Sequence, residues 1–338
     1  MLGAVGEVVV EVQRGEHVES RHRVSVAVVD AQGQLRAWAG DPRMTTFARS
    51  AIKPFQALPL VADGAADAFD LNVSELAVCC ASHSGEARHV SAVGSILRKI
   101  GADEEALACG PHAPFHEHSA RALREAGEKP RRIHNNCSGK HAGMLALARH
   151  HGWPLAGYHL PGHPVQQRVT RELSRWTDVA EDDLLFATDG CGVVTFAAPL
   201  DRFALAFARL AAAARKGAAD ASRIVTAMVR YPEYVAGTDR LCTTLMRAAS
   251  GRIFAKVGAE GVYMAGVPGA ELGVALKVED GAQRAAEPAL VAVLNKLSLL
   301  TGEEMAGLER YAEPRLKNTR GEEIGVIQSH VELATDHG

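Results

Sequence analysis

The chain has 338 residues, of which 47% are hydrophobic and 23% are charged, so it is long enough to bury a large core. Its net charge is −3, and no basic face is expected that could neutralise nucleic-acid phosphates. No segment approaches the roughly 18 apolar residues that a membrane span requires. The six cysteines are too sparse for a secreted disulfide scaffold. These features predict a soluble cytoplasmic protein that acts on a small molecule, with no nucleic acid and no membrane as partner.

Strand patterns open the chain and return in its last third. Short β-branched runs lie within residues 4–40, and further runs joined by glycine-rich turns lie within 252–280. Helical patterns fill the region from 50 to 250. Because the two strand groups can pair in one sheet with helices packed on it, the sequence predicts an α+β fold with an antiparallel sheet flanked by helices. We expect one catalytic domain over residues 1–330 and a frayed tail at 331–338.

Ser50 and Lys53 have a spacing that places them on one face of a helix. Side chains three apart have Cβ atoms roughly 5–6 Å apart, so Lys53 Nζ can reach Ser50 Oγ. A serine hydroxyl needs a neighbour that takes its proton, and a lysine can do so when burial or a nearby cation keeps it neutral. The spacing also occurs by chance, and a helix surface or N-cap pair is the simpler interpretation of these two residues alone.

Two later segments follow in the chain order of penicillin-binding proteins and serine β-lactamases. Ser82-His83-Ser84 lies on a loop between helices and resembles their Ser-x-Asn element, while Lys256-Val257-Gly258 ends a strand and resembles their Lys-Thr-Gly. Two lysines that converge on one site disfavour each other's charge, so one of them can act as a base near pH 7. Ser84 and Val257 replace the residues that hold a β-lactam, which argues against a β-lactam substrate.

Cysteines mark two further loops. Cys137 and Lys140 share one helical turn, and Cys191 lies on a glycine-flanked turn after a strand. Two cysteines on tight loops can hold a soft divalent metal such as Zn²⁺. A cysteine is more often a small buried hydrophobe, however, and a lysine must lose a proton before it binds a metal. Residue types alone therefore favour a structural role for the cysteines, and they leave His83 and His141 open between site residues and core histidines.

Several motifs together resemble the rhizobial-type L-asparaginase II family, and the resemblance spans nearly the whole chain. These motifs are Arg49-Ser50-x-x-Lys53-Pro54, Cys79 to Glu86, His134-Asn135-Asn136-Cys137-Ser138-Gly139-Lys140-His141, Asp189-Gly190-Cys191-Gly192 and Lys256 to Gly261. The run from Asn135 to His141 is the most specific of them. The resemblance implies a serine β-lactamase/glutaminase-like fold, hydrolysis of L-asparagine to L-aspartate and ammonia, and a zinc ion near the active site.

The resemblance also implies a role for each motif. Ser50 is the nucleophile, Lys53 is its base, and Ser82 pairs with a lysine from the C-terminal strands. The implied metal ligands and their polar neighbour are Cys137, Lys140 and Cys191, with Asp189 beside them. We choose Lys256 as the partner of Ser82, because it closes a strand before a glycine-rich turn, whereas Lys277 lies within a hairpin among charged neighbours. Three more side chains are candidates for binding the amine and carboxylate of the substrate: Arg49, His83 and Glu86.

Two alternative functions remain at this point. A glutaminase or broader serine amidase would use the same chemistry, and a non-catalytic zinc-dependent ligand-binding module could be built on the same fold. The intact pair of Ser50 and Lys53 argues against the binding module. A metal with two thiolate ligands suits the positioning of a substrate better than the generation of hydroxide. A homodimer is expected only because symmetric dimers are the commonest oligomers.

Overall fold

The computed structural model describes residues 6–336. The chain folds into two compact units. The first unit comprises Met1–Ala51, Ala197–Ala212 and Thr244–Gly338, and the second comprises Ile52–Phe196 and Ala213–Thr243. Both units are assembled from separated segments, so neither corresponds to a continuous stretch of chain.

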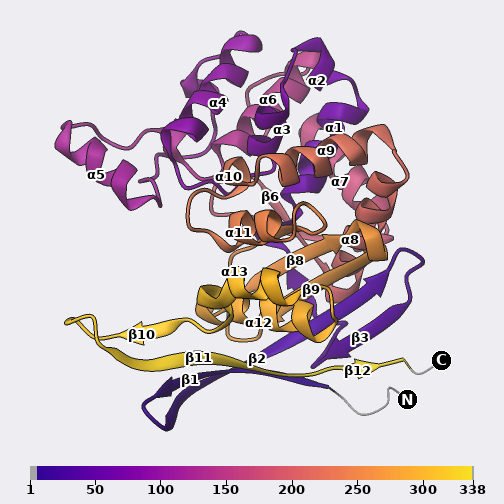
Figure 1. Cartoon of the computed structure of the whole chain (residues 1–338). Helices are drawn as coiled ribbons and strands as arrows, with labels where there is room; N and C mark the ends of the chain where they lie inside the picture. Colours follow the sequence, from indigo (N-terminus) through magenta and orange to yellow (C-terminus); the bar gives the residue numbers. More distant parts are fainter. Residues whose placement is uncertain (1–5, 337–338) are drawn as a thin grey trace. The chain divides into compact units, whose positions relative to one another are not determined.

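The first unit is built on an antiparallel sheet with strands from both ends of the chain (Figure 1). The strands follow the order β10-β11-β1-β2-β9-β8-β7, with β3 paired to β2 and to β12. Their bounds are β1 (Glu7–Arg14), β2 (His17–Asp30), β3 (Leu35–Ala39), β7 (Phe254–Val257), β8 (Val262–Val267), β9 (Leu272–Val278), β10 (Arg315–Lys317), β11 (Glu323–Glu332) and β12 (Ala334–Thr335).

The 14-residue strand β2 joins the two groups of strands that the sequence predicts to share a sheet. Its first half pairs with β1, and its second half, Val24–Asp30, pairs with Leu272–Val278 of β9. The predicted groups 4–40 and 252–280 therefore do lie in one sheet, apart from residues 4 and 5, which lie outside the described range. The α+β fold with an antiparallel sheet flanked by helices is confirmed.

Helices α8 (Leu200–Arg215), α12 (Gln283–Lys296) and α13 (Gly302–Ala312) accompany this sheet. Two glycines let α8 approach its strands closely. A Cβ atom on Gly273 would lie 1.9 Å from the carbonyl oxygen of Ala204, and one on Gly266 would lie 3.0 Å from that of Phe207. Side chains at these positions would push the helix away from the sheet.

The C-terminal segment is part of the sheet, and the prediction of a frayed tail over 331–338 is wrong for its described part. Strand β11 continues to Glu332, and β12 pairs Ala334 with Trp38 and Thr335 with Ala37. Residues 337 and 338 lie outside the described range. The short polar tail carries no local signal for this pairing, because its partner strand is about 300 residues away in the sequence.

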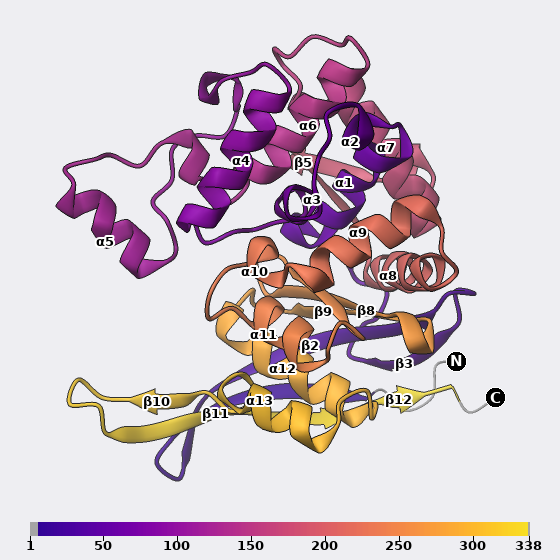
Figure 2. The same ribbon diagram turned by 45° about the horizontal axis from the view of Figure 1, so that its top comes forward.

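The second unit is mainly helical (Figures 1 and 2). Its elements are α1 (Lys53–Ala62), α2 (Ala65–Ala68), α3 (Val73–Cys79), α4 (Ala87–Lys99), α5 (Glu117–Glu125), α6 (Ser138–His150), α7 (Pro164–Thr177), α9 (Ala219–Arg230), α10 (Pro232–Val235) and the strand β5 (Leu185–Thr188), with short 3₁₀ turns η2 (Glu104–Ala106), η3 (Arg132–His134) and η4 (Glu181–Asp183). Helix α6 is buried over nearly its whole length and packs against α1, α3, α4 and α7. None of the helices within residues 6–336 combines the length and apolarity needed to cross a membrane.

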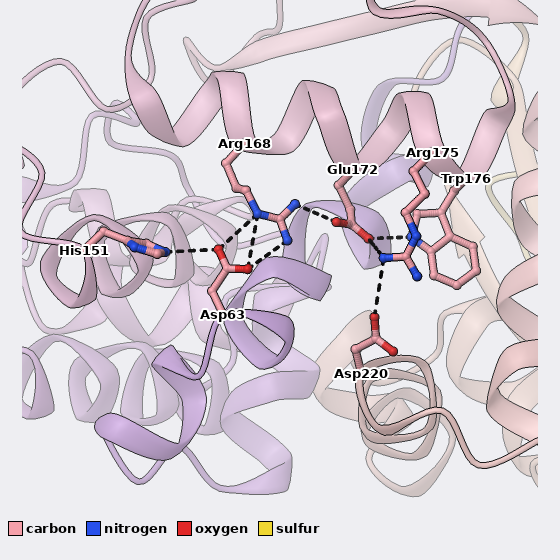
Figure 3. A network of polar contacts seen from close by, with 7 residues as sticks. All are labelled: Asp63, His151, Arg168, Glu172, Arg175, Trp176 and Asp220. Carbon is pink, nitrogen blue, oxygen red and sulfur yellow. Dashed lines mark hydrogen bonds and ion pairs between the residues drawn. The ribbon is translucent and has the colours of Figure 1, made fainter.

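A polar network ties α7 to the end of α1 and to α9 (Figure 3). Arg168 of α7 donates to both carboxylate oxygens of Asp63, at 2.8–3.2 Å, and to Glu172 at 2.6 Å. Glu172 is only 2% exposed, and it also accepts a 2.6 Å hydrogen bond from the Trp176 indole. The network therefore satisfies a buried carboxylate and fixes the orientation of α7.

The remaining elements are β4 (Thr45–Phe47), η1 (Arg49–Ile52), β6 (Val194–Pro199), α11 (Leu241–Ala248) and η5 (Pro268–Ala270). The sequence predicts a helix that begins at Ser50. In the structure Ser50 lies in η1, and the α-helix begins at Lys53. Pro54 occupies the first turn of α1, where its missing amide hydrogen has no cost.

Candidate functional site

Lys53 lies at the first position of α1 and is completely buried. Its Nζ donates to the Ala81 carbonyl at 2.6 Å, lies 2.9 Å from Ser82 Oγ, and lies 3.2 Å from Cys137 Sγ. These partners come from the loop after α3 and from the start of α6. The structure therefore brings Lys53 and Ser82 together, whereas the sequence pairs Lys53 with Ser50 and Ser82 with Lys256.

His83 follows Ser82 and is fully buried, with both ring nitrogens bonded. Its Nδ1 accepts a hydrogen bond from the Gly85 amide at 3.1 Å, so Nε2 carries the hydrogen that faces Ser138 Oγ at 2.9 Å. Burial lowers the pKa of His83 well below its usual range, and this leaves the ring neutral. These contacts hold the loop in place. The role of His83 in substrate binding stays a prediction.

Glu86, another candidate for substrate binding, is 5% exposed and already has protein partners. Its carboxylate accepts from Thr238 N at 2.7 Å and from Thr238 Oγ1 at 3.0 Å, and it forms an ion pair with Arg88 at 3.0 Å. Burial would raise the pKa of Glu86, but the hydrogen bonds from Thr238 lower it below its usual value. The ionised Glu86 carboxylate therefore holds the chain around Thr238 in place through hydrogen bonds.

Cys137, Lys140 and Cys191 meet within the second unit, as the implied metal site requires. Lys140 Nζ lies 3.0 Å from Cys191 Sγ, and the two cysteine side chains are hydrogen-bonded to each other. The hydrogen bond to Cys191 raises the pKa of the Cys137 thiol to about 12. The same bond, helped by the Lys140 cation, lowers the pKa of Cys191 to about 4. Without a metal, Cys137 is thus the thiol donor and Cys191 the thiolate acceptor.

Lys140 is held in its charged form by these sulfurs. Burial alone would lower its pKa, but Cys191, Cys137 and Asp189 raise it above the usual value. Asp189 also shapes the turn that carries Cys191, because its carboxylate accepts from the Gly190 amide at 2.8 Å and its own amide donates to the Val193 carbonyl at 2.8 Å. Asp189 therefore lies beside the implied ligands, as the resemblance suggests.

The donor chemistry of this cluster fits zinc, with two sulfurs and one amine nitrogen within reach of one another. Among residues 6–336, no group of three or more histidine, cysteine, aspartate or glutamate side chains is arranged to hold a metal ion. A metal bound by Cys137 and Cys191 would consequently need Lys140, or a ligand from outside the protein, as its third donor. Either route requires that Cys137, and Lys140 if it binds, lose a proton.

His141, which the sequence leaves open, has a core environment. It is fully buried in α6, and its Nδ1 lies 2.5 Å from the Tyr158 hydroxyl. The Tyr158 hydroxyl in turn accepts a 2.9 Å hydrogen bond from the Ala108 amide. Burial lowers the pKa of His141 well below its usual range. Tyrosine thus bridges the imidazole to the loop before α5, but the buried Nε2 of His141 has no hydrogen-bond partner among the described residues, so the choice between site and core histidine stays open.

Two other predicted site residues, Ser50 and Lys256, lie in the first unit. Arg49, directly before Ser50, has a φ of 51°, a left-handed conformation that costs a side-chain-bearing residue about 1–2 kcal/mol. Gly258 follows the strand that carries Lys256, and a Cβ atom there would lie 2.8 Å from the Ala48 carbonyl oxygen. The end of β7 therefore lies against the turn that leads into Ser50, within one unit.

The two candidate lysines of the late strands have different environments. Lys256 is completely buried, and its Nζ donates to the Val257 carbonyl at 2.8 Å. Lys277 is partly exposed and donates to the Val278 carbonyl. Burial lowers the pKa of Lys277, while Glu260 and two further acidic groups oppose that shift. Lys256 is the more deeply buried of the two, and the choice of Lys256 stays a prediction.

One part of the site was missed in the sequence. Residues 235–240 run beside the loop that carries Ser82 and Glu86, and they bring Thr238 and Arg240 to it. The run Gly237-Thr238-Asp239-Arg240 between two helical patterns was the available signal, because a glycine next to polar residues often marks a functional loop.

The fold and the site define an α+β protein in which a buried lysine contacts both a serine hydroxyl and a cysteine, with serine and lysine side chains recurring on several loops. The family model described as L-asparaginase II matches residues 10–329, and the chain belongs to that family. It is therefore an amidohydrolase of the asparaginase type. No curated protein matches the sequence.

Three solved structures resemble the chain at low sequence identity. The protein Mglu is 17% identical with a TM-score of 0.37, and the match covers 82% of this chain and 67% of that one. Its native form in 4.3 M NaCl is 16% identical with a TM-score of 0.38, covering 82% and 62%. A candidate β-lactamase from Bacteroides dorei is 10% identical with a TM-score of 0.40, covering 86% and 93%.

Proposed function

We propose that the protein hydrolyses L-asparagine to L-aspartate and ammonia through a serine ester, with Lys53 as the proton acceptor. Family membership supports the reaction type, and the 2.9 Å contact between Lys53 Nζ and Ser82 Oγ supports the proton acceptor. Lys53 is completely buried, and the nitrogen that contacts Ser82 is therefore shielded from solvent.

The nucleophile in this proposal is Ser50, whose hydroxyl forms a bond to the side-chain amide carbon as its proton leaves. Ammonia then departs, and water hydrolyses the ester to regenerate the serine. Ser82 holds Lys53 in place and passes protons to it. The hydrogen bond between Ser82 and Lys53 also favours a second assignment, in which Ser82 itself forms the ester.

Zinc is part of the proposal as a substrate-positioning cofactor, which when bound supplies a Lewis acid for an oxygen of the substrate. Cys137, Lys140 and Cys191 would hold it, and Asp189 would shape the turn that presents Cys191. In the protein without metal, Lys140 instead balances the charge of the Cys191 thiolate. The charges within the cluster therefore balance whether or not a metal is bound.

Glutamine is the closest alternative substrate, because it differs from asparagine by one methylene and presents the same amide. One methylene in a pocket is worth about 1–3 kcal/mol, so glutamine turnover would be slower by roughly 10–200-fold if the pocket fits asparagine. We further propose a cytoplasmic homodimer.

Ammonia release from L-asparagine by the wild type and by Ser50→Ala tests the proposal. The wild type is expected to release ammonia, and Ser50→Ala is expected to lose at least about 10³-fold in kcat. Rapid denaturation during turnover, followed by peptide mass spectrometry, identifies which serine carries the aspartyl ester. An ester on Ser82 would show that Ser82, and not Ser50, is the nucleophile. An inactive wild type would refute the function.

A further inference from the structure

Residues 235–240 lie alongside the loop that carries Ser82. Three contacts connect the two segments: Ser82 N to Val235 O at 3.0 Å, Ser84 Oγ to Ala236 O at 2.9 Å, and Thr238 N to Glu86 Oε1 at 2.7 Å. The residue numbers of the contacts rise in both segments, so the two segments run alongside each other in the same direction. The contacts therefore hold residues 235–238 beside the loop, just before Arg240.

Gly237 shows how closely the two segments approach. Its φ is 122°, a conformation that residues with side chains rarely adopt, and a Cβ atom there would lie 2.6 Å from both Glu86 Oε1 and Ser84 Oγ. Only glycine permits this approach. The Glu86 carboxylate can consequently grip both the amide and the hydroxyl of Thr238, two residues before Arg240.

The Arg240 guanidinium contacts this loop. Its NH1 lies 3.4 Å from Ser84 Oγ, and Ser84 lies two residues from Ser82, whose hydroxyl contacts Lys53. Two residues span at most about 7 Å of chain. In L-asparagine, three carbon–carbon bonds separate the side-chain amide carbon from the α-carboxylate carbon, which is about 4 Å. In the second assignment, in which Ser82 forms the ester, a substrate whose amide lies at Ser82 can thus place its carboxylate near Arg240.

We propose that Arg240 binds the α-carboxylate of the substrate and that Glu86 positions the segment that carries it. This inference rests on the proposed function, because it names the group that distinguishes an amino acid from a simple amide at that site. The arginine fork matches a carboxylate in a two-point contact, which lysine cannot reproduce. Glu86 is a positioning residue here, since its oxygens are occupied by Thr238 and Arg88.

The test compares two substrates that differ only in this group. L-Asparagine carries the carboxylate, and 3-aminopropanamide has the same amide and amine without it. Arg240→Met is expected to lower kcat/KM for L-asparagine by roughly 10²–10³-fold, mainly through KM, and to change kcat/KM for 3-aminopropanamide by less than about threefold. Arg240→Lys keeps the charge without the fork and is expected to lose about tenfold on L-asparagine.

Arg88→Met is the matched control, because Arg88 is an arginine that also pairs with this loop, through Glu86, but its side chain is 39% exposed on α4. It should leave the preference for L-asparagine over 3-aminopropanamide unchanged. Glu86→Gln should raise KM for L-asparagine and leave its kcat within about twofold, which loss of folding would not produce. An unchanged substrate preference in Arg240→Met would overturn the inference.

Calorimetric titration with L-aspartate separates this inference from the proposed function. The wild type and Arg88→Met are expected to bind L-aspartate, and Arg240→Met is expected to bind it at least about 50-fold more weakly. A wild type that binds L-aspartate in this Arg240-dependent manner without hydrolysing L-asparagine would refute the function and keep Arg240 as a carboxylate site. Equal affinities in the wild type and Arg240→Met would refute the site.

Discussion

Lys53 Nζ lies 2.9 Å from Ser82 Oγ while it also contacts the Ala81 carbonyl at 2.6 Å and Cys137 Sγ at 3.2 Å. A protonated lysine has three N–H groups and can donate to all three partners, whereas a neutral one has two N–H groups and a lone pair. A carbonyl can only accept, whereas a hydroxyl can also donate. Of the two oxygen contacts, the Ser82 hydroxyl is therefore the one that can give its proton to Lys53.

Removing either member of this pair should have nearly the same effect as removing both. Lys53→Met and Ser82→Ala are each expected to lower kcat by about 10²–10⁴-fold, the usual contribution of a positioned acid–base group. The double variant should be at most a few-fold slower than the worse single variant, because two residues that act as a unit are not additive. Steady-state ammonia release checks this, with the exposed Lys216→Met as control. Multiplicative losses in the double variant would show that the two residues act separately.

The sequence predicts the antiparallel sheet, which the structure confirms, but it does not predict the contact between Lys53 and Ser82. Lys53 is three residues from Ser50 and 29 from Ser82, so local spacing favours Ser50. The 3₁₀ turn at 49–52 does not contradict that argument, because side chains three residues apart also share a face of a 3₁₀ helix. Lys53 meets Ser82 because the chain between residues 53 and 82 folds back on itself. Helix periodicity contains no information about such a contact.

The cysteine cluster and the Arg240 segment differ in how far the sequence could reveal them. The resemblance brought Cys137 and Cys191 together, although 53 residues separate them and neither belongs to a CxxC motif. Arg240 could not be placed in the same way, because its contact to Ser84 depends on the glycine at 237 and on hydrogen bonds to Glu86. Such contacts between loops follow from tertiary structure alone.

The late lysines can be distinguished by single substitutions. Lys256→Ala is expected to lower kcat for L-asparagine by at least about 100-fold, since Lys256 is buried on the strand whose end lies against Ala48. Lys277→Ala should change kcat less than about threefold, because Lys277 is partly exposed. Circular dichroism confirms that both variants are folded. An equal loss from Lys277→Ala alone would transfer the role to Lys277.

Removal of metal should affect substrate binding more than turnover. Dialysis against a chelator is expected to raise KM for L-asparagine about tenfold or more and to lower kcat by less than about threefold, as a positioning role requires. Elemental analysis should find zinc in the wild type and little in Cys191→Ser, which removes the thiolate that faces Lys140. Cys242→Ser, at a buried cysteine outside the cluster, should retain the metal. Loss of turnover at saturating asparagine after chelation would contradict the positioning role.

The network around Arg168 should make stability depend on pH through Asp63. Burial alone would raise the pKa of Asp63, but Arg168 and His151 lower it below the usual value. A carboxyl whose pKa is lower in the folded state stabilises the protein fully above its unfolded pKa of about 4, and this contribution disappears as the pH falls through the folded pKa.

Asp63→Asn is therefore expected to lower the free energy of unfolding by about 1–3 kcal/mol at pH 7, because Arg168 loses one of its two carboxylate partners. The difference between wild type and variant should shrink below pH 4. Urea unfolding at pH 7, 5 and 3.5 measures it. Asp67→Asn, which removes the exposed partner of Arg223 in the same unit, should cost about 0.5 kcal/mol or less. If the Asp63→Asn difference stayed constant down to pH 3.5, the carboxylate would not be the group that stabilises this end of α1.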